Sequence, residues 1–296
     1  MKRILIVGCG DIAMRVAPLL QERYRLFGLV RRAERFAELR AAGITPLPGD
    51  LDDRTSLARI AGLADIVLHF APPPSATHLK NDDRKRLGID TRTCNLLAAL
   101  SHGAPPKRLI YIGTSGVYGD CGGAQVSETH PINPQTTRAQ LRADAERQIR
   151  GWAKRNQVNA NILRVPGIYA ADRLPLERIR AGTTAIAHEK DSCTNHIHAD
   201  DLARIAVAAL HHGKPNRVYH ASDNSQMKMG DYLDAVADIY GLPRPTRLPR
   251  AEVERSVPPA LWSFMNESRR LSNERIKKEL KIKLRYPTVT DALASI

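Results

Sequence analysis

An apolar run followed by a glycine turn at the N-terminus constrains the fold of this chain more than any other feature. Residues 4–7 (Ile-Leu-Ile-Val) are short and apolar enough for a buried strand, and Gly8 and Gly10 follow directly. The next apolar positions recur at helical spacing, at Ile12, Val16, Leu19 and Leu20. In this strand–turn–helix context, the pattern G-x-G-x-x-A predicts a nucleotide-binding site.

The residues of this turn have separate physical roles in the prediction. Gly8 permits the tight turn, Gly10 lets a diphosphate approach the backbone, and Ala13 lets the helix pack close to the strand. The helix start offers unpaired N–H groups and the positive end of its dipole to phosphate. An ordinary strand-to-helix turn is the alternative interpretation. The residues expected to contact the nucleotide are Gly8, Cys9, Gly10, Asp11 and Ile12.

Two arginines at the end of the second predicted strand, Leu26–Val30, indicate which dinucleotide is bound. Arg31 and Arg32 stand about 20 residues beyond the glycine turn, where an acidic residue would bind the ribose of NAD. Arginine at this position accommodates the 2′-phosphate of NADP instead. A solvated helix start is the alternative, but two cations are unfavourable beside the positive end of a helix dipole. We therefore expect NADP in preference to NAD.

Predicted strands alternate with predicted helices through the first half of the chain. Further strands are expected at 44–47, 64–70, 108–112 and 160–165, and helices at 11–22, 33–42, 82–102 and 134–156. This alternation predicts a Rossmann-type, doubly wound parallel sheet of the α/β class. Ligands bind beyond the carboxyl ends of such strands. The further residues expected at this edge are Asp50, Leu51, Ala71, Pro72, Thr114 and Pro166.

The regular alternation weakens after residue 168. Residues 170–195 are expected as loop and short helix, and 195–198 and 217–220 as short strands. Asp200 and Asp201 are expected to cap a helix that ends near His211. Helices are expected near 229–240, 258–266 and 272–280, with the Pro-rich stretch 243–259 as a connection. These patterns predict a nucleotide-binding domain over 1–168, to which 196–222 return, and a mainly substrate-binding lobe over 169–296.

Composition limits the classes of partner. The net charge of +14 comes from arginines spread along the chain, without the basic tail or aromatic–basic interleaving of nucleic-acid binders. The four cysteines are scattered, which argues against a metal site or a disulfide framework. No segment approaches the run of about 18 apolar residues that a membrane helix needs, and the first apolar run is too short for a signal peptide. We expect a cytoplasmic protein that binds a small molecule.

Several further motifs together resemble one family. The chain is similar to the extended short-chain dehydrogenase/reductase family, of the nucleotide-sugar epimerase and dehydratase type, over nearly its whole length. The G-x-G-x-x-A turn is closer to atypical members than to the usual three-glycine form. The motifs that carry the resemblance are the glycine turn, GDL at 49–51, TSGVYG at 114–119, LRVPGIY at 163–169, IHADDLA at 197–203 and LSNERI at 271–276.

The resemblance implies a Tyr-x-x-x-Lys pair on the helix after the fifth strand, and here the chain departs from the family. Arg138 stands at the tyrosine position and Arg142 at the lysine position. No tyrosine of the chain has a lysine four residues later. An arginine stays protonated and cannot exchange a proton near neutral pH, although it binds anions well.

The resemblance also implies roles for two residues near the fifth strand. Thr114 matches the family's catalytic Ser/Thr, and Tyr118 either reaches the same cavity or packs beside it. Dehydratases carry Asp-Glu where this chain has Ser115 and Gly116, and many epimerases carry an arginine where it has Thr194.

We therefore expect an NADP-dependent oxidoreductase or epimerase for a small carbonyl or sugar-like, anionic substrate. Its candidate catalytic residues are Thr114, Tyr118, Arg138 and Arg142, of which Arg142 also faces the cofactor. A non-catalytic NADP(H) sensor or regulatory protein is the alternative. By analogy with the family, we expect a homodimer through the helices at 82–102 and 134–156.

Overall fold

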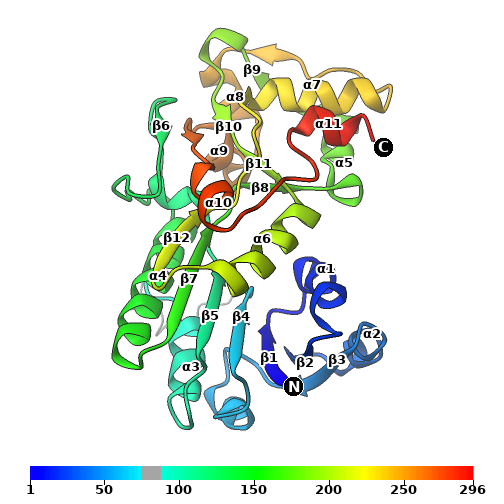
Figure 1. Cartoon of the computed structure of the whole chain (residues 1–296). Helices are drawn as coiled ribbons and strands as arrows, with labels where there is room; N and C mark the ends of the chain where they lie inside the picture. Colours follow the sequence, from blue (N-terminus) through cyan, green and yellow to red (C-terminus); the bar gives the residue numbers. More distant parts are fainter. Residues whose placement is uncertain (75–87, 296) are drawn as a thin grey trace.

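The computed structural model describes residues 1–74 and 88–295 and is built around one seven-stranded parallel sheet (Figure 1). Across the sheet, the strands follow the order β12-β7-β5-β4-β1-β2-β3. This arrangement confirms the predicted doubly wound fold. The strands are β1 (Lys2–Val7), β2 (Tyr24–Val30), β3 (Ile44–Pro48), β4 (Ile66–His69), β5 (Arg108–Ile112), β7 (Asn159–Arg164) and β12 (Arg217–His220).

Both faces of the sheet are buried, which explains why its strands are apolar runs and not alternating patterns. In β1, Ile4 and Ile6 face one hydrophobic core, and Leu5 and Val7 face the other. The helices α1 (Asp11–Leu20) and α6 (Ala199–His212) contribute to the first core. The helices α3 (Thr91–Leu100) and α4 (Thr137–Arg155), together with the 3₁₀ segment η2 (Arg54–Ile60), contribute to the second.

Strand β1 lies at the point where the order of the strands reverses. The chain moves from β1 to β2 and β3 on one side, and then returns to β4 on the other side of β1. Crossover connections therefore leave in opposite directions from the β1/β4 boundary, which opens a crevice at the carboxyl ends of these two strands. The glycine turn after β1 lies at this boundary.

The C-terminal part forms smaller cores of its own, drawn above the sheet in Figure 1. Its helices are α5 (Leu176–Arg180), α7 (Met229–Ile239), α8 (Arg250–Ser256), α9 (Pro259–Met265), α10 (Glu274–Glu279) and α11 (Val289–Leu293). Short strands accompany them: β8 (Gly167–Tyr169), β9 (Ala185–Ile186), β10 (Cys193–Thr194), β11 (His196–His198), β13 (Met227–Lys228) and β14 (Arg247–Leu248). One further pair joins β6 (Gln125–Val126) to β15 (Arg270–Leu271). The domain boundary at 168/169 stays a prediction.

Several expected elements differ in their bounds. The helix expected at 82–102 begins at Thr91, after Asp90 as its N-cap, and residues 82–87 lie outside the described part of the chain. The N-cap of α6 is His198, whose Nδ1 accepts from the amide of Asp200, so the two aspartates lie in the first turn and are not caps. The stretch 243–259, expected as a connection, contains α8.

A buried polar network joins the sheet to α4. The guanidinium of Arg164, 5% exposed, donates to both carboxylate oxygens of Glu146 over 3.1 and 2.7 Å and to the hydroxyl of Tyr118 over 2.7 Å. His220 Nδ1 lies 2.9 Å from the carbonyl of Ser272 and must therefore carry the proton. Its Nε2, 2.6 Å from the Tyr118 hydroxyl, then accepts from that hydroxyl. Each buried group thus has a partner, as buried polar groups require.

We expect Tyr118→Phe to destabilise the fold, because it removes the buried hydroxyl that Arg164 Nη1 and His220 Nε2 both contact. A loss of about 1–3 kcal/mol in the free energy of unfolding is expected, measured by urea denaturation. Tyr240→Phe is the matched control, since Tyr240 is half-buried and its hydroxyl makes no hydrogen bond within the described residues. Equal stabilities of the two variants would contradict the network's role.

Candidate functional site

A cavity of about 390 Å³ opens at the carboxyl ends of β1, β2 and β4, where the strand order reverses. Its walls come from the glycine turn, the ends of neighbouring strands and α4. Of the fourteen residues expected to contact the cofactor, twelve line it: Gly8, Cys9, Gly10, Asp11, Ile12, Arg31, Arg32, Asp50, Leu51, Ala71, Pro72 and Arg142.

The two glycines of the turn differ in what surrounds them. Gly8 has φ of +95°, and a Cβ there would lie 2.3 Å from the amide nitrogen of Ala71, so no other residue fits. Gly10 has φ of −87°, which any residue can adopt, and a Cβ there would meet nothing within 4 Å. Gly8 is therefore required by the fold, whereas the absence of a side chain at Gly10 leaves open space in the cavity.

Three arginines surround the end of β2. Arg31 is half-exposed and its Nη1 lies 3.9 Å from Asp50 Oδ2, and Arg32 is exposed. Arg35, which sequence analysis did not single out, donates from Nη1 to the carbonyl of Cys9 over 2.6 Å and also pairs with Glu38. Arg35 therefore links the segment after β2 to the glycine turn by this hydrogen bond.

Asp50 and Cys9 have settings that limit their chemistry. Asp50 accepts from the amide of Asp52, and the following 3₁₀ segment is capped by Asp53 instead. Asp50 therefore does not cap that segment, and it lines the cavity instead. Burial raises the pKa of the Cys9 thiol to about 12, so this cysteine is not a ready nucleophile.

Arg142 contributes a buried cation to the cavity. The residue belongs to α4 and is 7% exposed. Its Nη1 donates to the carbonyl of Ile112 over 2.6 Å and to the hydroxyl of Tyr111 over 3.2 Å. Its Nε is buried and has no hydrogen-bond partner among the described residues. An acceptor from a bound molecule would satisfy this donor.

The other expected site residues lie outside the cavity lining. Thr114 Oγ1 accepts from the amide of Gly116, and Tyr118 belongs to the buried network with Arg164 and His220. Arg138 lies over the ring of Phe264 in α9, 5.1 Å from its centroid. Pro166 also lies outside the lining, whereas Ile168, two residues later, is part of it. The position of Tyr118 does not support the catalytic role expected of it, because its hydroxyl is already committed within the fold.

Arg92 and Arg173 also line the cavity and were missed by sequence analysis. Arg92 pairs with Asp52 and donates to the carbonyls of Pro72 and Pro73. Arg173, in the 3₁₀ segment η6 (Ala171–Arg173), pairs with Asp11. Arg35 lies four residues after Arg31, near the same helix start, so this spacing could have indicated Arg35 as a further site residue. No local signal indicates Arg173, because its partner is 162 positions away.

Within the described residues, the structure has no helix with both the length and the apolar character needed to cross a membrane.

The human dTDP-D-glucose 4,6-dehydratase is similar to this chain in sequence. It is 24% identical over 176 residues, which cover 56% of this chain and 49% of the relative. The chain thus spans about half the length of that relative.

Two solved structures share the fold over almost the whole chain. One, a functionally unknown conserved protein from Silicibacter pomeroyi, has a TM-score of 0.78 and 26% identity, covering 100% of this chain and 98% of its own. The other, UDP-glucuronic acid 4-epimerase from Bacillus cereus in complex with NAD, has a TM-score of 0.76 and 20% identity, covering 98% and 96%.

A family model described as the NAD dependent epimerase/dehydratase family matches residues 4–222. This range includes the whole seven-stranded sheet except the first two residues of β1, and the complete glycine turn. With more than half of its length matched and the sheet order of a dinucleotide-binding fold, the chain belongs to the NAD dependent epimerase/dehydratase family.

Proposed function

We propose that this protein binds NADP in the cavity and acts as an oxidoreductase or epimerase on an anionic, sugar-like or small carbonyl substrate. The observation that carries the proposal is the charge of the cavity. Among the described residues, its lining holds two carboxylates, Asp11 and Asp50, against six guanidinium groups. The six belong to Arg31, Arg32, Arg35, Arg92, Arg142 and Arg173. Such a lining favours a ligand with several negative charges.

The residues present fit a dinucleotide. The open space beside Gly10 would admit the diphosphate, and the buried Nε of Arg142 would donate to a cofactor oxygen. Relatives of this chain include a structure with NAD bound, which by itself points to NAD. Arg31 and Arg32 favour NADP, because they stand where an acidic residue would select the free 2′-hydroxyl of NAD.

The substrate proposal rests on the relatives and on the arginines of α4. Relatives named as dTDP-D-glucose 4,6-dehydratase and UDP-glucuronic acid 4-epimerase act on nucleotide sugars. Arg142 lines the cavity, and Arg138, outside the lining, stands one helical turn before it; we infer that their two positive charges favour a carboxylate or phosphate on the ligand.

Proton transfer is the step that distinguishes this chain from a Tyr–Lys enzyme. When bound, a nicotinamide supplies or accepts hydride, and a protein group or water must move the accompanying proton. Among the described residues that line the cavity, there is no tyrosine, lysine or histidine. We infer that Thr114 or a bound water moves the proton, with slow turnover. The absence of a tyrosine, lysine and histidine from the described lining also favours the second candidate, a non-catalytic NADP(H)-binding sensor or regulatory protein.

Arg31→Ala/Arg32→Ala is expected to weaken NADP binding about 10- to 100-fold, because the charge-assisted hydrogen bonds to the 2′-phosphate together contribute about 1.5–3 kcal/mol. NAD binding is expected to change much less. Calorimetric titration of both cofactors provides the measurement. Arg180→Ala/Arg244→Ala is the matched control, since it removes the same charge from two exposed arginines outside the cavity lining. Equal affinities of the wild type for NAD and NADP would refute the preference.

Gly10→Val is expected to abolish dinucleotide binding while the fold survives. A branched side chain would enter the open space of the cavity, whereas the backbone at Gly10 tolerates any residue. Cofactor titration and thermal unfolding measure the two effects separately. Gly8→Ala is the contrasting variant, expected to lower the melting temperature because its Cβ would clash with the backbone of Ala71. Normal binding by Gly10→Val would show that the diphosphate lies elsewhere.

The arginines on α4 are expected to slow the chemistry on ordinary nucleotide sugars. Wild type, Arg138→Ala and Arg138→Tyr/Arg142→Lys are compared on nucleotide sugars and small carbonyl acids with NADPH. A family member with the Tyr–Lys pair is assayed in parallel as the reference. We expect little or no turnover of nucleotide sugars by the wild type, because neither guanidinium donates and recovers a proton near pH 7. Wild-type rates equal to the reference, unchanged in Arg138→Ala, would contradict both the mechanism and the role of Arg138.

A further inference from the structure

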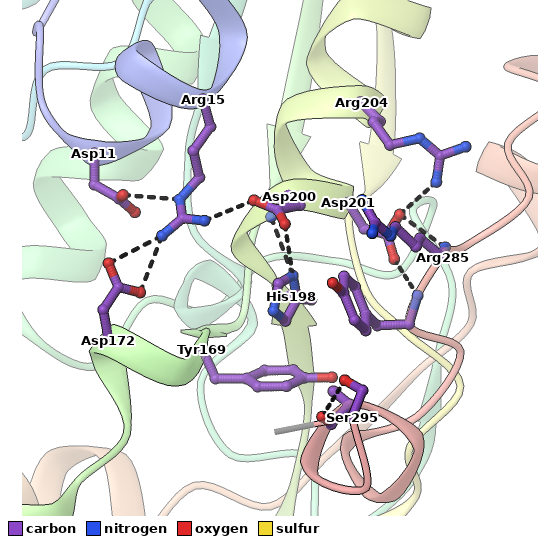
Figure 2. Close-up of polar contacts among 12 residues, drawn as sticks. Asp11, Arg15, Tyr169, Asp172, His198, Asp200, Asp201, Arg204, Arg285 and Ser295 are labelled. Atoms are coloured by element: carbon purple, nitrogen blue, oxygen red, sulfur yellow. Dashed lines mark hydrogen bonds and ion pairs between the residues drawn. The ribbon is translucent and has the colours of Figure 1, made fainter.

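A network of ion pairs connects the glycine turn to a segment far away in the sequence (Figure 2). Arg15 of α1 lies at its centre. Its Nε donates to Asp11 Oδ1 over 2.8 Å, its Nη1 to Asp200 Oδ1 over 2.6 Å, and its Nη2 to both oxygens of Asp172 over 3.0 and 3.1 Å. With all three nitrogens engaged by carboxylates, Arg15 holds α1, α6 and η6 together and has little capacity left for a ligand.

Arg173 is bound differently from Arg15. Its Nη1 donates to Asp11 Oδ2 over 2.7 Å, and within the described residues this is its one ion pair. Its side chain is 36% exposed and lines the cavity beside Gly10 and Asp11. A guanidinium has five N–H donors in a planar fork that matches phosphate oxygens. Arg173 therefore has donors to spare at the place where the cavity meets the start of α1.

The other buried or half-buried arginines of the cavity are less available. Arg35 is tied to Glu38 and the Cys9 carbonyl, and Arg92 to Asp52 and two proline carbonyls. The Nη1 of Arg142 is held by the Ile112 carbonyl and the Tyr111 hydroxyl, and its Nε, which has no partner among the described residues, is buried. Arg31 and Arg32 follow β2 at the expected adenosine end. Arg173 is thus the cation best placed to reach a ligand at the glycine turn.

The negative charge of Asp11 must be balanced by a cation if a diphosphate is to bind beside it. Its carboxylate lies in the first turn of α1, beside the space that a diphosphate would enter, and would repel that diphosphate. Each of its oxygens accepts from a guanidinium, one from Arg15 and one from Arg173. These pairs reduce the repulsion and hold Arg173 at the rim of the cavity before any ligand binds.

We propose that Arg173 binds the diphosphate of the dinucleotide, sharing its guanidinium between a phosphate oxygen and Asp11. The proposal rests on the proposed function, because it requires a dinucleotide in the cavity. Arg173 follows β8, far from α1 in the sequence, so this contact would also fix η6 over the bound cofactor. Arg173 is then a binding residue supplied from outside the N-terminal strand–turn–helix unit.

The test compares binding of ADP-ribose, which contains the diphosphate, with binding of 2′-AMP, which does not, by calorimetry. Arg173→Ala is expected to lower affinity for ADP-ribose about 10-fold or more and to leave 2′-AMP affinity unchanged. Arg173→Lys, which keeps the charge without the fork, should recover part of the loss. Asp172→Asn weakens the link between η6 and Arg15 but leaves Arg173 in place, and should lower ADP-ribose affinity less than threefold. Arg180→Ala removes an exposed cation outside the cavity lining as the control.

The outcomes separate this proposal from the proposed function. If the wild type binds neither ADP-ribose nor NADP nor NAD, the proposed function fails and this inference fails with it. If the wild type binds but Arg173→Ala stays within twofold of it, the Asp11–Arg173 pair is an ordinary surface ion pair and only this inference fails. Equal losses in Arg173→Ala and Asp172→Asn, or equal losses for both ligands, would assign Arg173 a structural role and overturn the proposal. Thermal unfolding of each variant verifies that it is folded.

Discussion

The site depends on the close approach of two backbones at the end of β1. The amides of Phe70 and Ala71, just after β4, both donate to the carbonyl of Val7, over 2.7 and 2.9 Å. Gly8 follows with φ of +95° and no room for a Cβ. This contact joins β1 to β4 as their crossovers separate to opposite sides. The turn can therefore direct the start of α1 toward the cavity only because residue 8 has no side chain.

Local patterns predicted the parts of the structure that are determined locally. The apolar runs of β1, β4 and β5 are buried on both faces, so composition alone identified them. The glycine turn and the arginines after β2 also fall where a standard strand–turn–helix unit places them. Twelve of the fourteen expected cofactor residues line the cavity for this reason. Their roles in binding stay a prediction until a ligand is measured.

Residues whose position depends on distant partners could not be predicted in this way. Arg173 lies at the cavity in an ion pair with Asp11 of α1, a contact across 162 positions that no local pattern encodes. The direction of the Tyr118 hydroxyl is set by Arg164 and His220, which arrive from β7 and β12. Short helices such as α8 were missed because a few polar residues between prolines give little periodicity.

The arginine at the lysine position of α4 keeps a positive charge and a structural contact at the site, but it does not restore the proton transfer of a Tyr–Lys pair. Arg142 bonds to the carbonyl of Ile112, the last residue of β5, and to the hydroxyl of Tyr111, so it joins α4 to the strand end that borders the cavity. A cation remains at that end of the cavity, with a buried Nε still available to an acceptor. Without a tyrosine one turn earlier, however, the phenol that this cation contacts is that of Tyr111, a fully buried residue whose pKa burial raises to about 12. The electrostatics of cofactor binding therefore persist where the usual proton donor does not.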